Sequence, residues 1–321
     1  MSGIKPWRWI VALTLTLTAV LAAGCSTASG APTIRVGVVC GGIGLAALTI
    51  DEGGLPDGVQ AQQVCFDSGS SAVQALAGGS IDAFVGSADH IVNNRAKGFD
   101  VKGYAVVSEK PPYSLVSPAS ASVERVTDLA GKSVAVTAPG SLSDTELQRA
   151  AAEAGIPYKG LHVVAAGTGA TMQATVEKGG AAAGMVSDPL LTTMVQSGEF
   201  TVTWKPSFRF IALTVIARSS WVDSHKPAMQ AFLTAVRATQ ERAKSDPPGT
   251  LATARKQAPA LSPQVLTAVL QATLDQAPPG LTIDEGLYQD TADVLVQVGQ
   301  AQRDKIPSFS DAFDFSLLGH R

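Results

Sequence analysis

Glycine and small hydroxyl residues form short turns between the apolar segments of this sequence. The turn at 138–141, Ala-Pro-Gly-Ser, joins the β-branched segment 133–137 to a helical pattern that begins near Ser143. A strand that leads through a glycine turn into a helix N-terminus points unpaired backbone N–H groups at one spot. In an open α/β sheet this spot lies outside the carboxyl ends of the strands, where ligands bind. The alternative is an ordinary turn, with Ser143 as N-cap, Glu146 as its capping-box partner and Gly155 ending the helix.

Residues for covalent, metal or cofactor chemistry are scarce. The 321 residues include 3 cysteines and 4 histidines, without metal-ligand spacing, and no pair of catalytic carboxylates stands out. The glycines at 41–44 lack the dinucleotide fingerprint. The Gly-Lys-Ser at 131–133 is not a phosphate loop, because Val126 stands where the first glycine of that motif belongs. We therefore expect no catalytic residues, no metal and no cofactor, and hence a protein that is not an enzyme.

The composition argues against a nucleic-acid-binding protein, and the length indicates the number of domains. Charged residues make up 16% of the chain, the net charge is −3, and no run of lysine or arginine occurs, so nucleic-acid binding is not expected. Hydrophobic residues make up 45%, and the length is sufficient for two domains of ordinary size.

The first residues have the pattern of a targeting segment. Lys5 and Arg8 precede the apolar run 10–23, which has the length of a signal-peptide core. The run ends in Leu-Ala-Ala-Gly-Cys, which resembles the lipobox of bacterial lipoproteins, with Ala22 in place of its usual leucine.

This resemblance implies processing and lipid attachment. We expect residues 1–24 to be a lipoprotein signal peptide, Cys25 to carry the lipid, and residues 25–32 to be a flexible tether. The protein would then be extracytoplasmic and lipid-anchored to the cell membrane. The alternative is a plain secretory peptide that is cleaved near Gly24.

The other two cysteines could form a disulfide. Cys40 and Cys65 stand at the ends of two predicted strands that would be neighbours. A disulfide is allowed outside the cytoplasm. The alternative is two buried thiols.

Segments typical of strands and of helices alternate along the chain. Such alternation predicts parallel sheets with helices between successive strands. The predicted strands are 33–40, 59–66, 82–86, 101–108, 133–137, 161–165, 183–187 and 200–204. The predicted helices are 44–52, 71–78, 89–97, 143–154, 169–178 and 189–197, followed by 226–245, 247–257, 262–275 and 284–302.

Two interruptions divide this pattern into two lobes. Lys-Pro-Pro-Tyr at 110–113 leads into an extended segment, and 208–217 has the pattern of a long apolar strand. Each is a candidate crossing between lobes. The predicted lobe one comprises 33–114 plus 209–321, and the predicted lobe two comprises 115–208.

An internal sequence repeat supports two lobes of similar structure. The order of turn, helix, strand and polar turn from Gly69 to Asp89 is similar to that from Gly167 to Asp188. Both copies share a Gln-Ala pair in the helix and a serine after the strand. General βα patterning explains the order of elements but less easily these shared residues.

Three stretches resemble motifs of a known family. Residues 74–86 read Gln-Ala-Leu-Ala-Gly-Gly-Ser-Ile-Asp-Ala-Phe-Val-Gly, and residues 128–136 read Asp-Leu-Ala-Gly-Lys-Ser-Val-Ala-Val, followed by Pro-Gly-Ser at 139–141. Ser-Asp-Pro at 187–189 is similar to the Glu-Pro turn of the same family. The family is the NMT1/THI5-like group, which includes aliphatic sulfonate, taurine, nitrate and thiamine-precursor binding proteins of ABC importers. The resemblance covers roughly residues 33–245.

The resemblance implies an α/β structure of the type II periplasmic-binding-protein fold. In that fold two doubly wound α/β lobes are joined by two hinge crossings, the ligand lies in the cleft between them, and here a helical C-terminal part would follow. The chain departs from the family pattern at Ala182, where an acidic residue is usual, and at Asp188, where many members have glutamate. The ligand of another member is therefore not transferred to this chain.

In such a fold the turns that follow the strands line the cleft. None of them offers lysine or arginine, so a small sulfonate-like anion would be held by helix N-termini and hydroxyl groups. The alternative ligand is a neutral or cationic heterocycle, such as a thiamine precursor, with Asp89 or Asp188 as acceptor. The expected ligand-binding residues are Gly41, Gly42, Ser70, Ser71, Ser87, Ala88 and Asp89 from lobe one and Gly140, Ser141, Leu142, Ser143, Thr168, Gly169 and Asp188 from lobe two.

Each of these positions also has a structural interpretation. The serines and aspartates of the turns could serve only as helix caps. The turns at 69–71 and 139–141 are expected to face each other across the cleft. His90 is expected on a helix surface, and Trp204 and Phe210 are expected in the core rather than against a ligand.

The resemblance implies a solute-binding lipoprotein that delivers a small solute to an ABC importer. Its partners would be the small-molecule ligand, the ABC permease with its ATPase, and the membrane, and the protein is expected to be a monomer. One alternative is a ligand-sensing protein for a signalling partner. A less favoured alternative is an enzyme similar to the thiamine-precursor synthase of the same family, whose cysteine-rich site is absent from this sequence.

Overall fold

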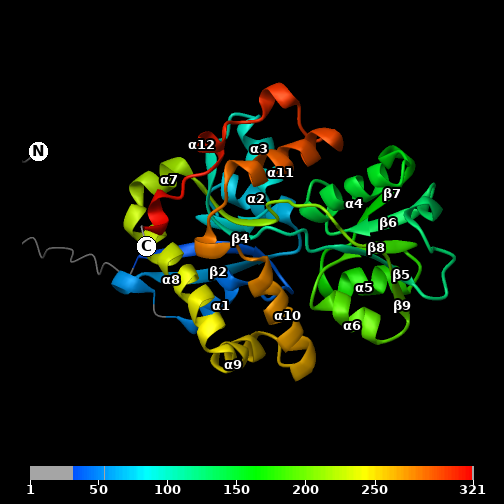
Figure 1. Ribbon diagram of the computed structural model, residues 1–321, viewed down its shortest axis with the longest axis horizontal. Helices are drawn as coiled ribbons and strands as arrows, with labels where there is room; N and C mark the ends of the chain where they lie inside the picture. The colour runs from blue at the N-terminus through cyan, green and yellow to red at the C-terminus, as the bar shows by residue number, and fades with distance from the viewer. Residues whose placement is uncertain (1–31, 54, 320–321) are drawn as a thin grey trace, which may run out of the picture. The chain divides into compact units, whose positions relative to one another are not determined.

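The computed structural model describes residues 32–53 and 55–319, which contain two five-stranded sheets with helices on their faces (Figure 1). The strand order is β2-β1-β3-β10-β4 in the first sheet and β7-β6-β8-β5-β9 in the second. The first sheet holds β1 (Thr33–Val39), β2 (Gln60–Phe66), β3 (Ala83–Gly86), β4 (Val101–Ser108) and β10 (Leu213–Arg218). The second sheet holds β5 (Ser114–Pro118), β6 (Ser133–Val136), β7 (His162–Ala165), β8 (Ala183–Val186) and β9 (Phe200–Trp204). Lobe one is the first sheet with its helices, and lobe two is the second sheet with its helices.

Helices cover both sheets, and the C-terminal helices belong to lobe one. Lobe one contains α1 (Leu45–Glu52), α2 (Gly69–Ala77) and α3 (Ala88–Arg95), and lobe two contains α4 (Leu142–Glu153), α5 (Gly169–Glu177) and α6 (Leu190–Gln196). The helices after β10 pack on the side of lobe one (Figure 1). They are α7 (Ser219–Ser224), α8 (Lys226–Ser245), α9 (Pro247–Gln257), α10 (Pro263–Gln276), α11 (Glu285–Gln297) and α12 (Phe309–Ala312). The predicted α/β class and helical C-terminal part are therefore confirmed.

Both sheets are mixed, whereas the sequence pattern predicted parallel sheets. In lobe one, β10 runs antiparallel to β3 and β4, and in lobe two, β5 runs antiparallel to β8 and β9. The reason is the path of the chain. Each crossing leaves one sheet at the carboxyl ends of its parallel strands and enters the other sheet at the carboxyl ends of that sheet's parallel strands. The first strand after each crossing, β5 or β10, therefore runs antiparallel to its neighbours. The carboxyl ends of both sheets therefore face the boundary between the lobes.

The crossings themselves are residues 109–113 and 205–212. The long strand predicted at 208–217 begins only at Leu213, so its first half was predicted wrongly. Residues Phe210 and Ile211 are apolar because they are fully buried in the core of lobe one, next to the crossing. An apolar run of this length does not distinguish a buried strand from a buried irregular segment.

The strands of the first sheet are covered on both faces. Alternate residues of β3 point to opposite sides, so Ala83 and Val85 belong to the core that includes α1, α8 and α10, whereas Phe84 belongs to the core that includes α2, α3 and α11. All three side chains are buried. A strand with this environment reads as a continuous apolar run, as the sequence does here.

The start of α4 differs from the predicted cap. The N-cap is Ser141 rather than Ser143, whose hydroxyl instead accepts a hydrogen bond from the backbone N–H of Thr137 over 3.0 Å. Glu146 does not complete a capping box, because it is fully buried and accepts from the backbone N–H of Tyr113 over 3.0 Å. The predicted end of this helix is confirmed, since the residue after its C-cap is Gly155 with a φ of 68°.

A disulfide joins the ends of β1 and β2 in the structure. It links Cys40 to Cys65, whose Cα atoms are 5.3 Å apart. The predictions for the signal peptide 1–24 and for lipid attachment at Cys25 lie outside the described residues. Among residues 32–53 and 55–319, no helix combines the length and the apolar character needed to cross a bilayer.

Candidate functional site

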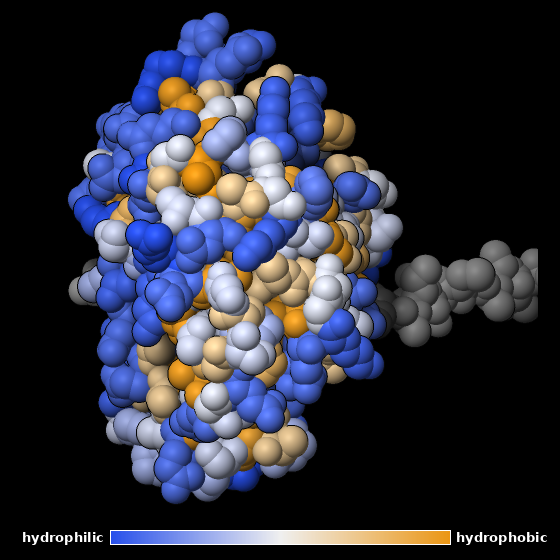
Figure 2. Space-filling view, turned by 90° about the vertical axis from the view of Figure 1, so that its right-hand side faces the viewer, coloured by the Kyte–Doolittle hydropathy of each residue, from blue (hydrophilic) through white to orange (hydrophobic). Residues whose placement is uncertain are grey.

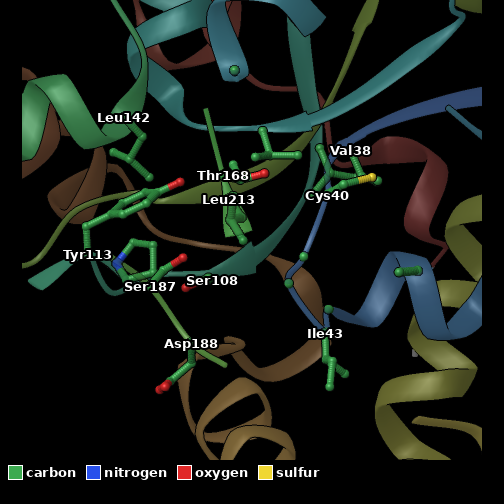
Figure 3. A pocket seen from close by; sticks show the side chains of 18 of the residues that line it. Val38, Cys40, Ile43, Ser108, Tyr113, Leu142, Thr168, Ser187, Asp188 and Leu213 are labelled. Atoms are coloured by element: carbon green, nitrogen blue, oxygen red, sulfur yellow. The ribbon is translucent and has the colours of Figure 1, made fainter. Parts of the chain in front are cut away.

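A cavity of about 470 Å³ lies between the two lobes, at the carboxyl ends of both sheets. Residues far apart in the sequence line it, because the ends of β1, β3, β4 and β8, the first residue of β10 and the turns after the strands meet here. Figure 3 shows side chains from both lobes, and from the crossing between them, around a common space: Tyr113, Leu142, Thr168, Asp188, Val38, Cys40, Ile43 and Leu213.

The walls of this cavity are more apolar than the outside of the protein. Among the described residues, only Phe99 and Val195 are large apolar side chains that are exposed. Figure 2, which views the lobe-two end of the molecule, shows apolar residues scattered among hydrophilic ones. A concave apolar surface with a few polar groups is the usual form of a small-molecule site.

Eight of the fourteen residues expected to bind ligand line the cavity. Each stands at the end of a strand or in the turn into the following helix. They are Gly41, Gly42, Ser87, Ser141, Leu142, Thr168, Gly169 and Asp188.

The other six expected residues do not line the cavity, because neighbouring groups already occupy their polar atoms or because they face solvent. Ser70, Ser71, Ala88, Asp89, Gly140 and Ser143 form this group. For example, the N–H of Ala88 donates to the carbonyl of Ile211 over 3.1 Å, and that of Gly140 donates to Asp144 over 2.8 Å. Capping and internal hydrogen bonds therefore explain these positions.

Sequence reasoning missed several lining residues. His90, expected on a helix surface, is 4% exposed and lines the cavity. Tyr113 and Ser108 line it from the first crossing and from the end of β4, and α10 contributes Thr273 and Gln276. The polar turn after β4 was the one local signal available, whereas nothing in the α10 sequence indicates that it reaches the cavity. Trp204 and Phe210 do not line the cavity. Phe210 is buried in the core of lobe one, as expected, and Trp204 packs half-buried against the core of lobe two.

The cavity has no cationic side chain of lysine or arginine among the described residues that line it, and its one carboxylate is Asp188. Asp188 also serves α6, because its Oδ1 accepts from the backbone N–H and the hydroxyl of Thr192 over 3.0 and 2.6 Å. Burial and the nearby carboxyl of Glu146 raise the pKa of Tyr113, so its hydroxyl stays protonated and can donate a hydrogen bond. The arrangement can bind a small solute through hydroxyls and apolar walls.

The lobes also touch directly beside the cavity, in a contact that we name the α4 interface. It is formed with lobe one by Ser141, Leu142, Thr145 and Arg149. The Oγ of Ser141 accepts from the backbone N–H of Ser70 over 3.3 Å and lies 3.2 Å from the Oγ of Ser70. The turns at 69–71 and 139–141 therefore face each other, as the sequence predicted, but they meet in direct contact.

Buried polar groups continue the α4 interface. The hydroxyl of Thr145 donates to Asp89 over 2.7 Å and accepts from the amide of Gln300 over 2.9 Å. Asp89 is 1% exposed and also accepts from the hydroxyl of Ser87 and from the backbone N–H of His90. Its acceptor positions are used within the protein, which explains why it is not available to a ligand.

No group of three or more histidine, cysteine, aspartate or glutamate side chains is arranged to hold a metal ion within residues 32–53 and 55–319.

Comparison with known proteins places this geometry in a family. The family described as NMT1/THI5 like matches residues 57–249. No curated protein sequence matches the chain.

Solved structures share the fold at low sequence identity. The alkanesulfonate-binding protein SsuA from Xanthomonas axonopodis pv. citri, bound to MOPS, is 18% identical, with a TM-score of 0.71 over 89% of this chain and 99% of that chain. The periplasmic aliphatic sulphonate binding protein SsuA from Escherichia coli is 19% identical, with a TM-score of 0.60 over 83% and 92%. The ligand-binding component of an ABC-type import system from Staphylococcus aureus is 15% identical, with a TM-score of 0.70 over 89% and 98%.

Proposed function

Since the chain belongs to the NMT1/THI5-like family and has the fold of periplasmic binding proteins, we propose that it captures a small solute between its lobes and delivers it to an ABC importer. The observation that carries this proposal is the cavity of about 470 Å³ enclosed by the carboxyl ends of both sheets. Strand ends and helix N-termini are where open α/β sheets bind ligands. The eight lining residues that the sequence predicted are proposed to contact the solute.

Closure of the lobes supplies the mechanism. Among the described residues, the chain passes from one lobe to the other only at the crossings 109–113 and 205–212, so these segments can act as hinges. A solute that contacts Ser87 in lobe one and Thr168 in lobe two stabilises the closed arrangement over the open one. The closed form is then the one that a permease recognises.

We further propose that the protein lies outside the cytoplasm, is anchored to the membrane by a lipid on Cys25 and acts as a monomer. The targeting pattern of residues 1–24 supports this location. Replacement of Cys25 by serine is expected to move the protein from the membrane fraction to the soluble fraction of the producing cell. A Cys25→Ser protein that stays in the membrane fraction contradicts the lipid anchor but leaves solute binding intact.

Solute capture is tested by thermal unfolding of the full-length protein with a panel of alkanesulfonates, taurine, nitrate and aminopyrimidines. A ligand present at 100 times its Kd is expected to stabilise the protein by about 2.7 kcal/mol, which raises Tm by several degrees. Chromatography of the recovered ligand should show it unchanged, since binding and not turnover is proposed. If no compound raises Tm and native mass spectrometry of the purified protein shows no carried-over small molecule, the proposal fails.

A further inference from the structure

The cavity lacks the groups that hold a full negative charge. No lysine or arginine lines it among the described residues, and the only lining carboxylate, Asp188, is itself an acid. A buried anion needs a counter-charge or several strong hydrogen bonds to replace the water that it loses. The carboxylate of Asp188 would repel an anion, and no lysine or arginine among the described lining residues would neutralise it.

Helix N-termini could replace a counter-charge, but in three of the six helices that begin at the cavity a side chain of the protein already accepts from a backbone N–H of the first turn. In two of the three this side chain is an aspartate. The pairs are Ser68 with Ser71 N–H in α2, Asp89 with His90 N–H in α3 and Asp188 with Thr192 N–H in α6. The partial positive charge of a helix N-terminus is offset where a carboxyl group already binds it. Among the described residues, α1, α4 and α5 begin at the cavity without a side-chain cap bond. The first turn of α4 carries Asp144, whereas the N–H groups of α1 and α5 are neutral donors with no carboxyl group in the first turn.

In the part of the chain that the structure describes, the cavity wall contains polar side-chain atoms without a hydrogen-bond partner, among them the buried Oε1 of Gln63 and the ring nitrogens of His90. His90 is 4% exposed, and within the described residues its imidazole makes no hydrogen bond; its Nδ1 is 3.9 Å from the carboxylate of Asp89. Its ring lies 5.5 Å from the ring of Phe84. A buried polar group without a partner is costly to the folded protein, so such a group in a cavity wall indicates where a ligand's polar edge belongs.

The backbone leaves room for this ring. A Cβ atom built on Gly69 would lie 2.7 Å from Nε2 of His90, so only glycine fits at position 69 with the ring in this place. An imidazole ring offers an N–H donor and, where its other nitrogen carries no proton, an acceptor. The ring can therefore pair with a ligand group that itself offers an acceptor or a donor, such as an amide, a sulfonamide or a ring nitrogen beside an amine.

We infer that the cavity selects an uncharged ligand with an apolar body and a polar edge that pairs with His90, and that it discriminates against sulfonates and other anions. This inference rests on the proposed solute capture and narrows its ligand class. The apolar body would pack on walls formed by Ile43, Phe84, Leu142, Met172, Met185 and Leu213. The neutral N–H groups of α1 and α5 would serve the remaining polar atoms of the ligand.

Compounds that differ only in their charged group test the inference directly. Isothermal titration calorimetry of the full-length protein would compare benzenesulfonate with benzenesulfonamide, hexanesulfonate with hexanesulfonamide, and nicotinate with nicotinamide. Each pair keeps the apolar body and changes an anion into an uncharged amide. The uncharged member is expected to bind at least tenfold more tightly.

Two outcomes overturn this inference. Equal or tighter binding of the anionic members overturns the ligand class and leaves solute capture intact. The absence of measurable binding by every uncharged member also overturns it. The proposed solute capture is then decided separately, by the thermal-unfolding panel and by mass spectrometry of a carried-over ligand.

Variants of His90 test its part in recognition. His90→Leu is expected to weaken binding of the uncharged members at least tenfold and to reduce their preference over the anions, while His90→Gln, which keeps a donor and an acceptor, recovers part of the affinity. His225→Leu is the matched control, because His225 is exposed and does not line the cavity. A purely structural role for His90 would lower Tm without changing the ratio of the two affinities. An unchanged ratio in both folded variants overturns the role of His90.

Discussion

The N-terminal turns of α2 and α5 have similar sequences but different surroundings. Ser68 and Thr168 are the N-cap residues of the two helices, and both have extended backbones. The hydroxyl of Ser68 accepts from the N–H of Ser71 over 3.2 Å, and its side chain is buried. Thr168 makes no such cap bond and lines the cavity. The same local pattern therefore closes a helix N-terminus in lobe one and leaves it open in lobe two.

The difference arises from what lies opposite each turn. The α2 turn faces the start of α4, where Ser70 contacts Ser141, so its polar groups are used in the α4 interface. The α5 turn faces the cavity and contributes Gly167, Thr168 and Gly169 to its wall. The repeated turns thus lie at the carboxyl edge of each sheet, where the other lobe and a ligand can be contacted. Tertiary contacts decide which turn binds the other lobe and which is available to a solute.

The largest expected effect is at Ser141, which belongs to both environments. It is 1% exposed, contacts Ser70 and also lines the cavity. We expect Ser141→Trp to abolish ligand binding, with a loss of more than 100-fold, because the indole would occupy the cavity and hold the lobes apart. Overpacking at such a site is expected to cost about 1–3 kcal/mol of stability, so the fold should survive.

Calorimetric titration and circular dichroism measure the two effects of Ser141→Trp separately. Ser70→Ala is the control, because it removes the partner hydroxyl without placing anything in the cavity, and it should leave the affinity nearly unchanged. A folded Ser141→Trp protein with the affinity of the unmodified chain would show that this turn is only a cap.

A reciprocal pair of smaller substitutions tests the comparison of the two turns. Ser68→Ala removes a cap bond and should cost about 1 kcal/mol of stability without changing the affinity. Thr168→Val should leave stability nearly unchanged, because its hydroxyl caps nothing, but should weaken ligand binding three- to tenfold, which is about 1 kcal/mol. Chemical denaturation measures the stability of each variant, and titration measures its ligand affinity. If both variants lose stability and keep affinity, the two turns have the same role.

Much of the fold could be predicted from the sequence because its signals are local. The β-branched segment 133–136 and the helix that ends before Gly155 appear where the pattern places them. The direction of β5 and β10 could not be predicted in this way. It depends on where the two crossings enter the other sheet, and the hydrophobic periodicity of a single segment contains no information on this.

The cavity could be predicted only in part, for the same reason. Turn chemistry identified Ser87 and Thr168, but it also selected Asp89, whose acceptors are used by Ser87, His90 and Thr145. Such competition among neighbours is a tertiary property. The helix-surface position expected for His90 was wrong, since its ring lies between Phe84 of β3 and Gly69 of the α2 turn, and these residues are distant in the sequence.

The smallest effect that we expect concerns Glu146, one turn into α4. Burial raises the pKa of Glu146 well above its ordinary value, and the charge of Asp89 adds to the shift, while the N–H of Tyr113 opposes it. As pH rises above the ordinary carboxyl range, the unfolded chain releases this proton and the folded chain retains it. Stability therefore falls with rising pH until the folded group also ionises.

Glu146→Gln removes this proton release and keeps an acceptor for the N–H of Tyr113. We expect the variant to be slightly less stable than the unmodified protein at pH 4, because its amide leaves an N–H unpaired, and to gain stability relative to the unmodified protein as the pH rises to 8. Urea unfolding at several pH values measures the difference. Asp82→Asn should behave in the opposite way: burial acts to raise the pKa of Asp82, but the hydrogen bonds and charge of Arg35 lower it, so its ionised form stabilises the fold at neutral pH. Parallel stability curves for Glu146→Gln and the unmodified protein would contradict this prediction, because they would show that the carboxyl of Glu146 ionises over the same pH range in the folded and the unfolded chain.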